Sequence, residues 1–169
     1  GHHDTTYMMV QSMLDNVQAI RGNVVMDMGC GTAILGILAA KMGAAKVYGI
    51  DIDAVAAQSA YDNARLNRVG RKVETYCGDA SLLQMGKYNV LLANIHRNVI
   101  IMDLRTYASS LKVGGLLFLS GFYVSDVEDI VAEASKYGLE LQCRREREGW
   151  ACLTMRLVSP ISISDVISR

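Results

Sequence analysis

The sequence lacks most of the features that tie a protein to a membrane, to nucleic acid or to a structural metal. Its 17 basic and 17 acidic residues balance, so there is no positive excess for non-specific binding to nucleic acid or anionic lipid. No apolar run reaches the roughly 18 residues of a membrane-spanning helix. The four cysteines, Cys30, Cys77, Cys143 and Cys152, form no C-x-x-C pair, which argues against a zinc site. We expect them to be small apolar residues of a reduced, cytoplasmic protein.

Apolar residues make up 51% of the 169 positions, enough for one domain with a hydrophobic core. Predicted strands, which are mostly continuous apolar runs, alternate with predicted helices. This pattern is typical of a parallel sheet covered on both faces. Strands are predicted at 24–28, 46–51, 73–77, 88–94 and 116–120, and helices at about 5–20, 33–42, 54–67, 99–111 and 127–137. The last helix is expected to begin at an S-x-x-E capping box, Ser125 to Glu128. Residues 139–144 and 150–157 alternate in polarity, which predicts a terminal antiparallel hairpin.

One stretch carries the strongest functional signal, Asp27-Met28-Gly29-Cys30-Gly31-Thr32-Ala33. It follows an apolar strand and precedes an apolar helix, and its glycines let a ligand approach the backbone. The G-x-G-x-x-G fingerprint of dinucleotide sites fails because its third position is Ile34, and the lysine of a P-loop is missing. What remains, D-x-G-x-G-[ST]-[GA], resembles motif I of class I S-adenosylmethionine-dependent methyltransferases. That resemblance implies a Rossmann-like, doubly wound α/β sheet of seven strands.

Further residues extend the predicted cofactor site. Asp27 suits the ammonium of S-adenosylmethionine, and Asp51, at the end of the second strand, can take both ribose hydroxyls. The resemblance places Asp79 where the family reads the adenine amine, although Asp51 and Asp79 could instead be capping or turn acids. The predicted cofactor-binding residues are Thr5, Thr6, Asp27, Gly29, Cys30, Gly31, Asp51, Ile52, Asp79, Ala80 and Asn94.

Residues outside motif I resemble one narrower family. The opening Gly1-His2-His3-Asp4-Thr5-Thr6 resembles the F-G-T-G-H-H-E-T-T segment of PrmA enzymes, which methylate the eleventh protein of the large ribosomal subunit. Similar stretches are Gly49-Ile50-Asp51-Ile52-Asp53, Leu92-Ala93-Asn94-Ile95, Gly114-Gly115, Ser120-Gly121 and Arg147-Glu148-Gly149-Trp150-Ala151. Ala54 and His96 depart from the proline and leucine of the family pattern. The resemblance implies a catalytic domain at 1–158, a tail at 159–169 and an N-terminal substrate-recognition domain absent from this sequence.

The same resemblance implies methyl transfer from S-adenosylmethionine, without a metal, to lysine side chains or the α-amine of a ribosomal protein. An amine attacks only when it is deprotonated, and a pocket that excludes water lowers the pKa of lysine from its usual value of roughly 10.4. We predict that Asn94, at the end of the fourth strand, is the catalytic residue, because its carbonyl oxygen can accept a hydrogen bond from the amine. The alternative is that Asn94 caps the next helix.

Other side chains stay open between two roles. Thr5 and Thr6 either close over the methionine end of the cofactor or cap the first helix. His96 is either a base or a solvent-facing histidine, and Trp150 either packs in a strand or stacks on the substrate. The segment Asn94 to Arg97 lacks the [DNS]-P-P-[YF] pattern of amino methyltransferases that act on bases, so we expect no direct binding of nucleic acid.

Two alternatives to the ribosomal-protein methyltransferase remain. A methyltransferase of the same fold could act on a small molecule or another protein. A cofactor-binding fragment could be inactive without its missing domain.

Overall fold

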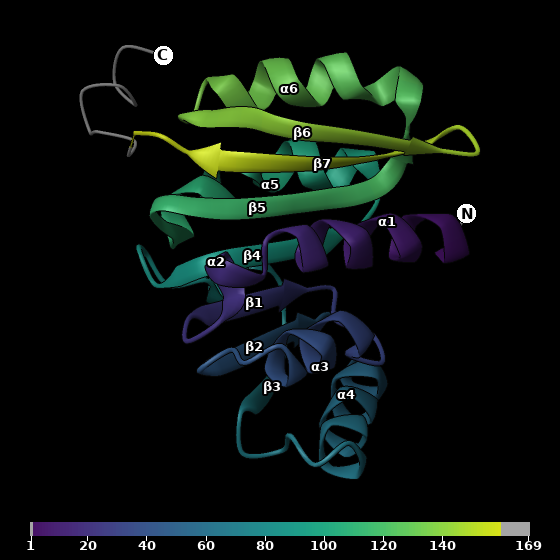
Figure 1. Cartoon of the computed structure of the whole chain (residues 1–169), viewed down its shortest axis with the longest axis vertical. Coiled ribbons are helices and arrows are strands. Elements are labelled where there is room, and N and C mark those ends of the chain that lie inside the picture. The colour runs from purple at the N-terminus through teal and green to yellow at the C-terminus, as the bar shows by residue number, and fades with distance from the viewer. Residues whose placement is uncertain (1, 160–169) are drawn as a thin grey trace.

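The structure of the chain, a computed structural model, describes residues 2–159 (Figure 1). The helices are α1 (His2–Asp15), α2 (Val17–Ile20), α3 (Ile34–Lys41), α4 (Ala54–Leu66), α5 (Arg97–Ser110) and α6 (Val127–Ser135), with 3-10 turns η1 (Ala80–Leu82) and η2 (Val124–Asp126). The strands are β1 (Val24–Met28), β2 (Lys46–Asp51), β3 (Val73–Cys77), β4 (Tyr88–Asn94), β5 (Leu111–Tyr123), β6 (Leu139–Arg147) and β7 (Trp150–Leu157). The predicted tail, apart from Ser159, lies outside the described residues.

The seven strands form one sheet in the order β3-β2-β1-β4-β5-β7-β6. Strands β1 to β5 pair in parallel, whereas β7 runs antiparallel to both β5 and β6. The predicted fold class, a doubly wound sheet of seven strands with a terminal antiparallel hairpin, is therefore confirmed. No helix among the described residues is long and apolar enough to cross a membrane.

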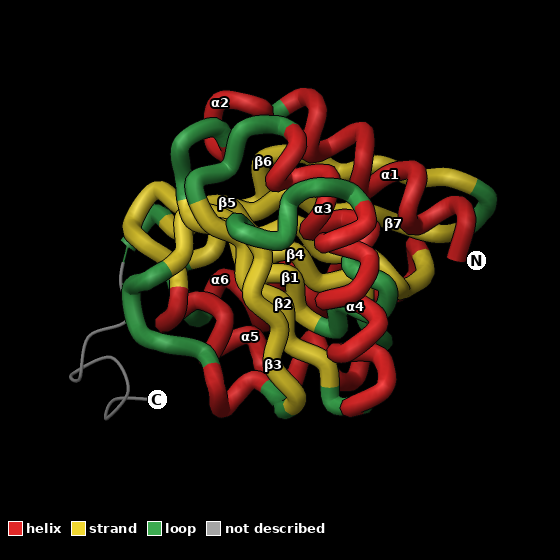
Figure 2. Tube along the Cα trace, turned by 90° about the horizontal axis from the view of Figure 1, so that it is seen from below, coloured by secondary structure: helices red, strands yellow, loops and turns green. Residues whose placement is uncertain are grey.

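Helices cover both faces of this sheet, as Figure 2 shows. Alternate residues of each strand point to opposite faces, so β1 sends Met26 to one core and Val25 to the other. The core that contains Met26 includes buried side chains of α5 and α6, such as Leu104 and Ile130. The core that contains Val25 includes buried side chains of α1 to α4, such as Met9. Continuous apolar strands follow directly from this two-sided burial.

The strand order reverses direction between β1 and β4, which lie side by side in the middle of the sheet. The chain leaves β1 for α3 on one face and leaves β4 for α5 on the other. The loops after the two strands therefore diverge and open a crevice at the carboxyl edge of the sheet. In open α/β sheets this switch point is where ligands bind.

Several predictions of local structure were wrong. The first helix is broken in two at Asn16, whose amide donates to the Ser12 carbonyl oxygen at 2.8 Å. Strand β5 begins earlier and ends later than the predicted 116–120, because its far end pairs with β7. Ser125 does not cap α6; it lies inside η2, and the carboxylate of Asp126 accepts a hydrogen bond from the Tyr123 N–H at 2.9 Å. Local sequence could not show that this 3-10 turn precedes the helix.

The cysteine prediction is correct for two residues and wrong for two. Cys30 and Cys152 are buried, whereas Cys77 and Cys143 are exposed, and all four are free thiols. Cys77 ends β3 and Cys143 lies at the bulge in β6, at positions where the strand faces solvent. Both strands are edges of the sheet, and the residues next to each cysteine, such as Tyr76 and Arg144, are exposed as well.

Candidate active site

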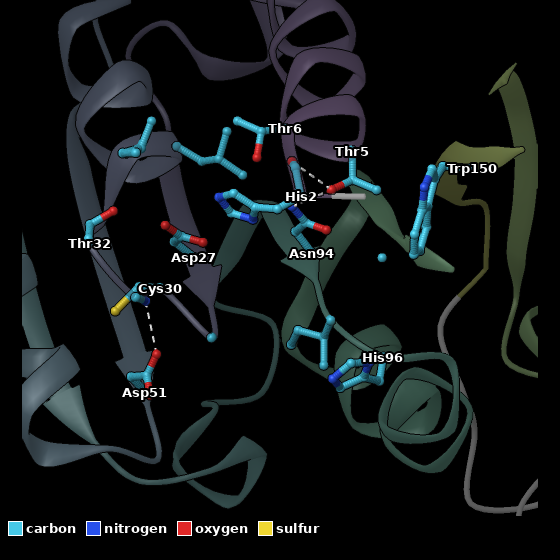
Figure 3. Close-up of a pocket in the computed structure, with 16 residues that line it drawn as sticks. His2, Thr5, Thr6, Asp27, Cys30, Thr32, Asp51, Asn94, His96 and Trp150 are labelled. Atoms are coloured by element: carbon cyan, nitrogen blue, oxygen red, sulfur yellow. Dashed lines mark hydrogen bonds between the residues drawn. The ribbon is translucent and has the colours of Figure 1, made fainter. Parts of the chain in front are cut away.

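A cavity of about 650 Å³ opens at the switch point between β1 and β4 (Figure 3). This volume lies within the range of sites that hold small organic ligands. Residues from β1, the following loop and α3 line one side of it, and residues from α1, β4, β5 and β7 line the other. Of the predicted site residues, the cavity brings together Thr5, Thr6, Asp27, Gly29, Cys30, Gly31, Asp51 and Asn94.

The glycine turn after β1 is held in a conformation that suits glycine. Gly29 and Gly31 have φ angles of +64° and +51°, in the left-handed region that side chains disfavour. A Cβ on Gly29 would lie 3.3 Å from the Ile95 side chain, whereas a Cβ on Gly31 would meet no protein atom within 4 Å. The backbone at Gly31 is thus bare toward the cavity, which leaves room for a ligand to approach it.

Asp51 connects the second strand to this turn. Its Oδ2 accepts a hydrogen bond from the Gly31 N–H at 2.9 Å, and its Oδ1 accepts one from the Asp53 N–H at 2.9 Å. Each carboxylate oxygen keeps further acceptor capacity toward the cavity. Asp51 does not cap α4, because Asp53 does so by accepting from the Val55 N–H at 2.9 Å.

Asp27 is a carboxylate in the core of the site, and only 4% of its surface is exposed. Burial raises its pKa from 3.8 to about 7; the charge of Asp51 raises it further, and a hydrogen bond from the Gly36 N–H at 3.2 Å opposes the shift. An ammonium group in the cavity would relieve this cost because it would pair with the ionised form. Burial likewise raises the pKa of the neighbouring Cys30 thiol to about 12, so the thiol stays protonated and unreactive.

Asn94 lies across the cavity from the glycine turn, beside the first turns of α1 (Figure 3). Its Nδ2 donates to Thr5 Oγ1 at 3.2 Å, and the Thr5 hydroxyl donates to the His2 carbonyl oxygen at 3.1 Å. Thr5 is buried, and Thr6 also lines the cavity. Both threonines lie within α1, which begins at His2, so the reading of them as an N-cap pair is wrong. Asn94 does not cap α5, whose first turn is preceded by His96.

Three predicted residues lie outside the cavity lining. Ile52 is 80% exposed, and Ala80 is buried at the start of η1. Asp79 caps η1 by accepting from the Ser81 N–H at 2.9 Å and from the Ser81 hydroxyl at 2.5 Å. The Gly78 N–H donates to the Asp51 carbonyl oxygen at 2.9 Å, which keeps this segment next to Asp51. Ile52, Asp79 and Ala80 thus lie next to Asp51, after the ends of β2 and β3. Their contact with adenine stays a prediction.

The cavity also contains residues that sequence reasoning did not assign to it. They are His2, Thr32, Ile34, Leu35, Ile95 and Gly121. Ile34 directly follows the motif that ends at Ala33, and this position in the sequence could have assigned it to the site, where 56% of its surface is exposed. His96 is exposed and lines the cavity without capping α5 through its side chain. No group of three or more His, Cys, Asp or Glu side chains suited to a metal occurs within residues 2–159.

Comparison with known proteins places this geometry in a family. The family model described as ribosomal protein L11 methyltransferase (PrmA) matches residues 1–157. The chain belongs to the ribosomal protein L11 methyltransferase family. A family member from Porphyromonas gingivalis is 44% identical over 161 residues, which make up 95% of this chain and 54% of that protein. One from Burkholderia multivorans is 37% identical over 153 residues, or 90% of this chain and 49% of that protein.

The resemblance drawn from the motifs is therefore confirmed. The chain spans about half the length of these relatives. Solved structures agree on the fold: the ribosomal protein L11 methylase of Lactobacillus delbrueckii subsp. bulgaricus superposes with a TM-score of 0.86 at 22% identity, covering 94% of this chain and 81% of that one. An RNA methyltransferase from Salinibacter ruber in complex with S-adenosyl-L-homocysteine gives a TM-score of 0.73 at 21% identity, covering 91% and 93%.

Proposed function

We propose that this chain is the methyl-transferring domain of an S-adenosylmethionine-dependent protein N-methyltransferase. Its substrates would be lysine side chains or the α-amine of a large-subunit ribosomal protein. The observation that carries the proposal is the placement of the Asn94 amide, fixed by Thr5, across one cavity from the Gly29–Gly31 turn. Membership of the ribosomal protein L11 methyltransferase family supports the choice of substrate.

The residues of the cavity suit S-adenosylmethionine. The bare backbone at Gly31 and the carboxylate of Asp51 would hold the ribose, and Asp27 would meet the ammonium of the methionine end. Thr6 and Cys30 would contact the same molecule from opposite walls, while Ile52, Asp79 and Ala80 would meet the adenine end. When bound, this cofactor supplies a methyl group on a positively charged sulfur, which departs as a neutral thioether. We expect no metal to take part.

The acceptor chemistry falls to the chain's own side chains. An amine must reach the cavity without its proton, and the apolar surroundings of Ile95 and Trp150 disfavour the charged form. The amide oxygen of Asn94 would accept one N–H of the neutral amine and hold its lone pair toward the glycine turn. Because the amine arrives neutral, no base is needed while its nitrogen, the methyl group and the sulfur are held in line. The methylated product carries an extra proton, which is released to water.

The partner implied is a ribosomal protein met in the cytoplasm, with no direct contact to nucleic acid. Because the chain spans about half the length of its relatives, we propose that cofactor binding resides here and that tight capture of the protein substrate draws on more of the full-length protein. A fragment of this kind would bind the cofactor well and turn over slowly.

The test is an assay with methyl-labelled S-adenosylmethionine offered in parallel to purified large-subunit ribosomal protein and to a metabolite extract, with mass spectrometry of the labelled product. We expect label on amino groups of the ribosomal protein. Label found only on small molecules would mean that the substrate is a small molecule and not the ribosomal protein. Cofactor binding in calorimetry without transfer to any acceptor would mean that the chain only binds the cofactor.

A further inference from the structure

A second hollow, of about 640 Å³, opens at the carboxyl end of α4. It is lined by the last turns of α4 and by the turn that leads into β3, so it lies at the amino edge of the parallel strands. The candidate active site opens at the carboxyl edge, and the two linings have no residue in common. A ligand of this hollow would therefore bind at a separate site.

The lining of this hollow is basic. It contains three arginines, one lysine and one aromatic ring but no carboxylate, and its residues are Tyr61, Arg65, Arg68, Val69, Gly70, Arg71 and Lys72. Over the described part of the chain, no carboxylate forms an ion pair with any of these cations. By contrast, Arg97 and Arg147 elsewhere on the surface are paired with aspartates. Unpaired cations around one hollow repel each other, and a bound anion would relieve that repulsion.

The chain turns sharply where α4 ends, and Arg68 is at the centre of the turn. Its φ angle is +63°, in the left-handed region where glycine or asparagine usually closes a helix. The Arg68 N–H donates to the Arg65 carbonyl oxygen at 3.0 Å, and the Val69 N–H donates to the Ala64 carbonyl oxygen at 2.9 Å. An arginine costs backbone energy at this position, and the guanidinium that it brings to the hollow is the group that an anion would contact.

The turn is fixed against the rest of the protein, so the hollow is formed before any ligand binds. The Lys72 N–H donates to the Val69 carbonyl oxygen at 2.9 Å, and the Lys72 carbonyl oxygen accepts from the Val47 N–H of β2 at 2.8 Å. A Cβ on Gly70 would lie 3.1 Å from Cγ of Arg65, which places the turn directly on the stem of that arginine. A preformed site loses less conformational entropy when it binds.

The ends of two helices explain part of this charge. The carboxyl end of a helix favours cations, which accounts for Arg65 in the last turn of α4. The same effect accounts for Lys72, whose Nζ donates to the Ala40 carbonyl oxygen in the last turn of α3 at 3.4 Å. It does not account for Arg71, which lies beyond both helices, or for Arg68 in a conformation that disfavours it.

We propose that this hollow binds the phosphate groups of a small polyphosphate, either inorganic or carried by a nucleoside. A guanidinium presents its N–H donors in a planar fork that matches two phosphate oxygens, and several such forks around one hollow match phosphates in series. The Tyr61 ring, with 41% of the residue exposed and the Arg65 guanidinium 5.8 Å from the ring centroid, would contact the nucleoside where there is one. The site is independent of the proposed function.

The test is isothermal titration calorimetry of the whole chain at low salt with four compounds. Sodium triphosphate and cytidine 5′-triphosphate represent the two sources, cytidine lacks the phosphates, and citrate is a multivalent anion without phosphate. We expect both triphosphates to bind with a Kd below about 1 mM, citrate to bind at least about tenfold more weakly, and cytidine not to bind. Tighter binding of cytidine 5′-triphosphate than of triphosphate would support a nucleotide, and equal binding would support a free polyphosphate. Failure of both triphosphates to bind, or citrate binding as tightly, would overturn the proposal.

Two variants locate the binding. Arg68→Asn removes a cation and suits the left-handed backbone, and Arg71→Gln removes a cation from the turn. Each should raise the Kd for triphosphate about three- to tenfold. Arg156→Gln is the matched control, because it removes the same charge from an exposed arginine of β7 that does not line the hollow, and its Kd should stay within about twofold of the parent value. Parent-like affinity in both Arg68→Asn and Arg71→Gln would overturn the proposal.

A competition experiment separates this site from the candidate active site. Saturating S-adenosylhomocysteine should leave the Kd for triphosphate within about twofold of its value in the free chain, because the two linings are separate. Displacement of triphosphate would place the anion in the candidate active site and overturn the proposal. Binding of a short single-stranded RNA without binding of triphosphate would do so as well. Triphosphate binding in a chain that transfers no methyl group would sustain this site and remove only the proposed function.

Discussion

The side-chain amide of Asn94 donates a hydrogen bond of 3.2 Å to the hydroxyl oxygen of Thr5, a residue 89 positions away in the sequence. A threonine hydroxyl has one proton, and Thr5 gives it to the His2 carbonyl oxygen. Thr5 can therefore only accept from Asn94, so Asn94 must present its NH₂ group to Thr5. Its carbonyl oxygen is left free to accept a hydrogen bond, which is the role that we propose for it toward an incoming amine. Helix α1 thereby sets which way the amide points.

Replacing Thr5 tests this orientation. Thr5→Val keeps the shape but removes the acceptor, so the Asn94 amide can rotate, and we expect kcat to fall roughly tenfold, the rate equivalent of one lost hydrogen bond. Thr5→Ser retains the hydroxyl and should restore most of the rate. The measurement is steady-state methyl transfer at saturating cofactor. A Thr5→Val protein as active as Thr5→Ser would mean that Asn94 holds its orientation without this bond.

The carboxylate of Asp51 should dominate cofactor affinity. Asp51→Ala removes the acceptor for the Gly31 N–H as well as the proposed ribose contact, so the Kd for S-adenosylhomocysteine should rise by about 10- to 100-fold. Asp53→Ala, two residues further on, removes a carboxylate that only caps α4, so it should cost about 1 kcal/mol of folding free energy and leave the Kd nearly unchanged. Calorimetry on both variants checks this. Equal losses of affinity in the two would remove Asp51 from the ribose site.

The buried carboxyl of Asp27 should make the stability of the cofactor-free chain depend on pH. Its folded-state pKa of about 7 lies above the ordinary 3.8, so between these values the folded chain holds a proton that the unfolded chain has lost. The free energy of unfolding therefore decreases as pH rises through this window, on the order of 2 kcal/mol between about pH 5 and pH 8. Urea unfolding at both pH values should show this loss in the parent and a smaller one in Asp27→Asn. Parallel pH profiles would show that Asp27 titrates normally.

The bulge at Gly121 should tolerate no side chain. Gly121→Ala combines a left-handed φ with overlap on the Ile95 backbone, and we expect a loss of at least about 2 kcal/mol in the free energy of unfolding. Gly149→Ala is the matched control, because Gly149 also has a positive φ, +82°, but open space around it, so it should cost about 1 kcal/mol. Chemical denaturation measures the free energy of unfolding of both variants. Gly149→Ala reports the cost of backbone strain alone, and Gly121→Ala reports that strain together with steric overlap. If both lose the same free energy, the close approach of β5 to Ile95 is not rigid.

Periodicity and composition were enough to predict the sheet, its parallel part and its terminal hairpin. Strands that are buried on both faces are continuous apolar runs, and the strands of the hairpin alternate in polarity. The glycine turn and Asp51 were predictable because their spacing is local to one strand-turn-helix unit. The family resemblance placed Thr5 and Asn94 in one predicted site, but the hydrogen bond between them was not predictable, since residues 89 positions apart meet only through the packing of α1 on the sheet. The Gly121 bulge was missed for a similar reason: its register is decided by β7, which follows much later in the chain.

Asn94 is proposed to direct methyl transfer from a cofactor held by the opposite wall of the same cavity. This role is tested most directly by comparing Asn94→Ala with the parent chain in two measurements, calorimetric affinity for S-adenosylhomocysteine and the rate of methyl incorporation into ribosomal protein amines at saturating cofactor. We predict an affinity within about threefold of the parent and a rate at least about 100-fold lower. An Asn94→Ala chain that transfers methyl groups at the parent rate would contradict the account.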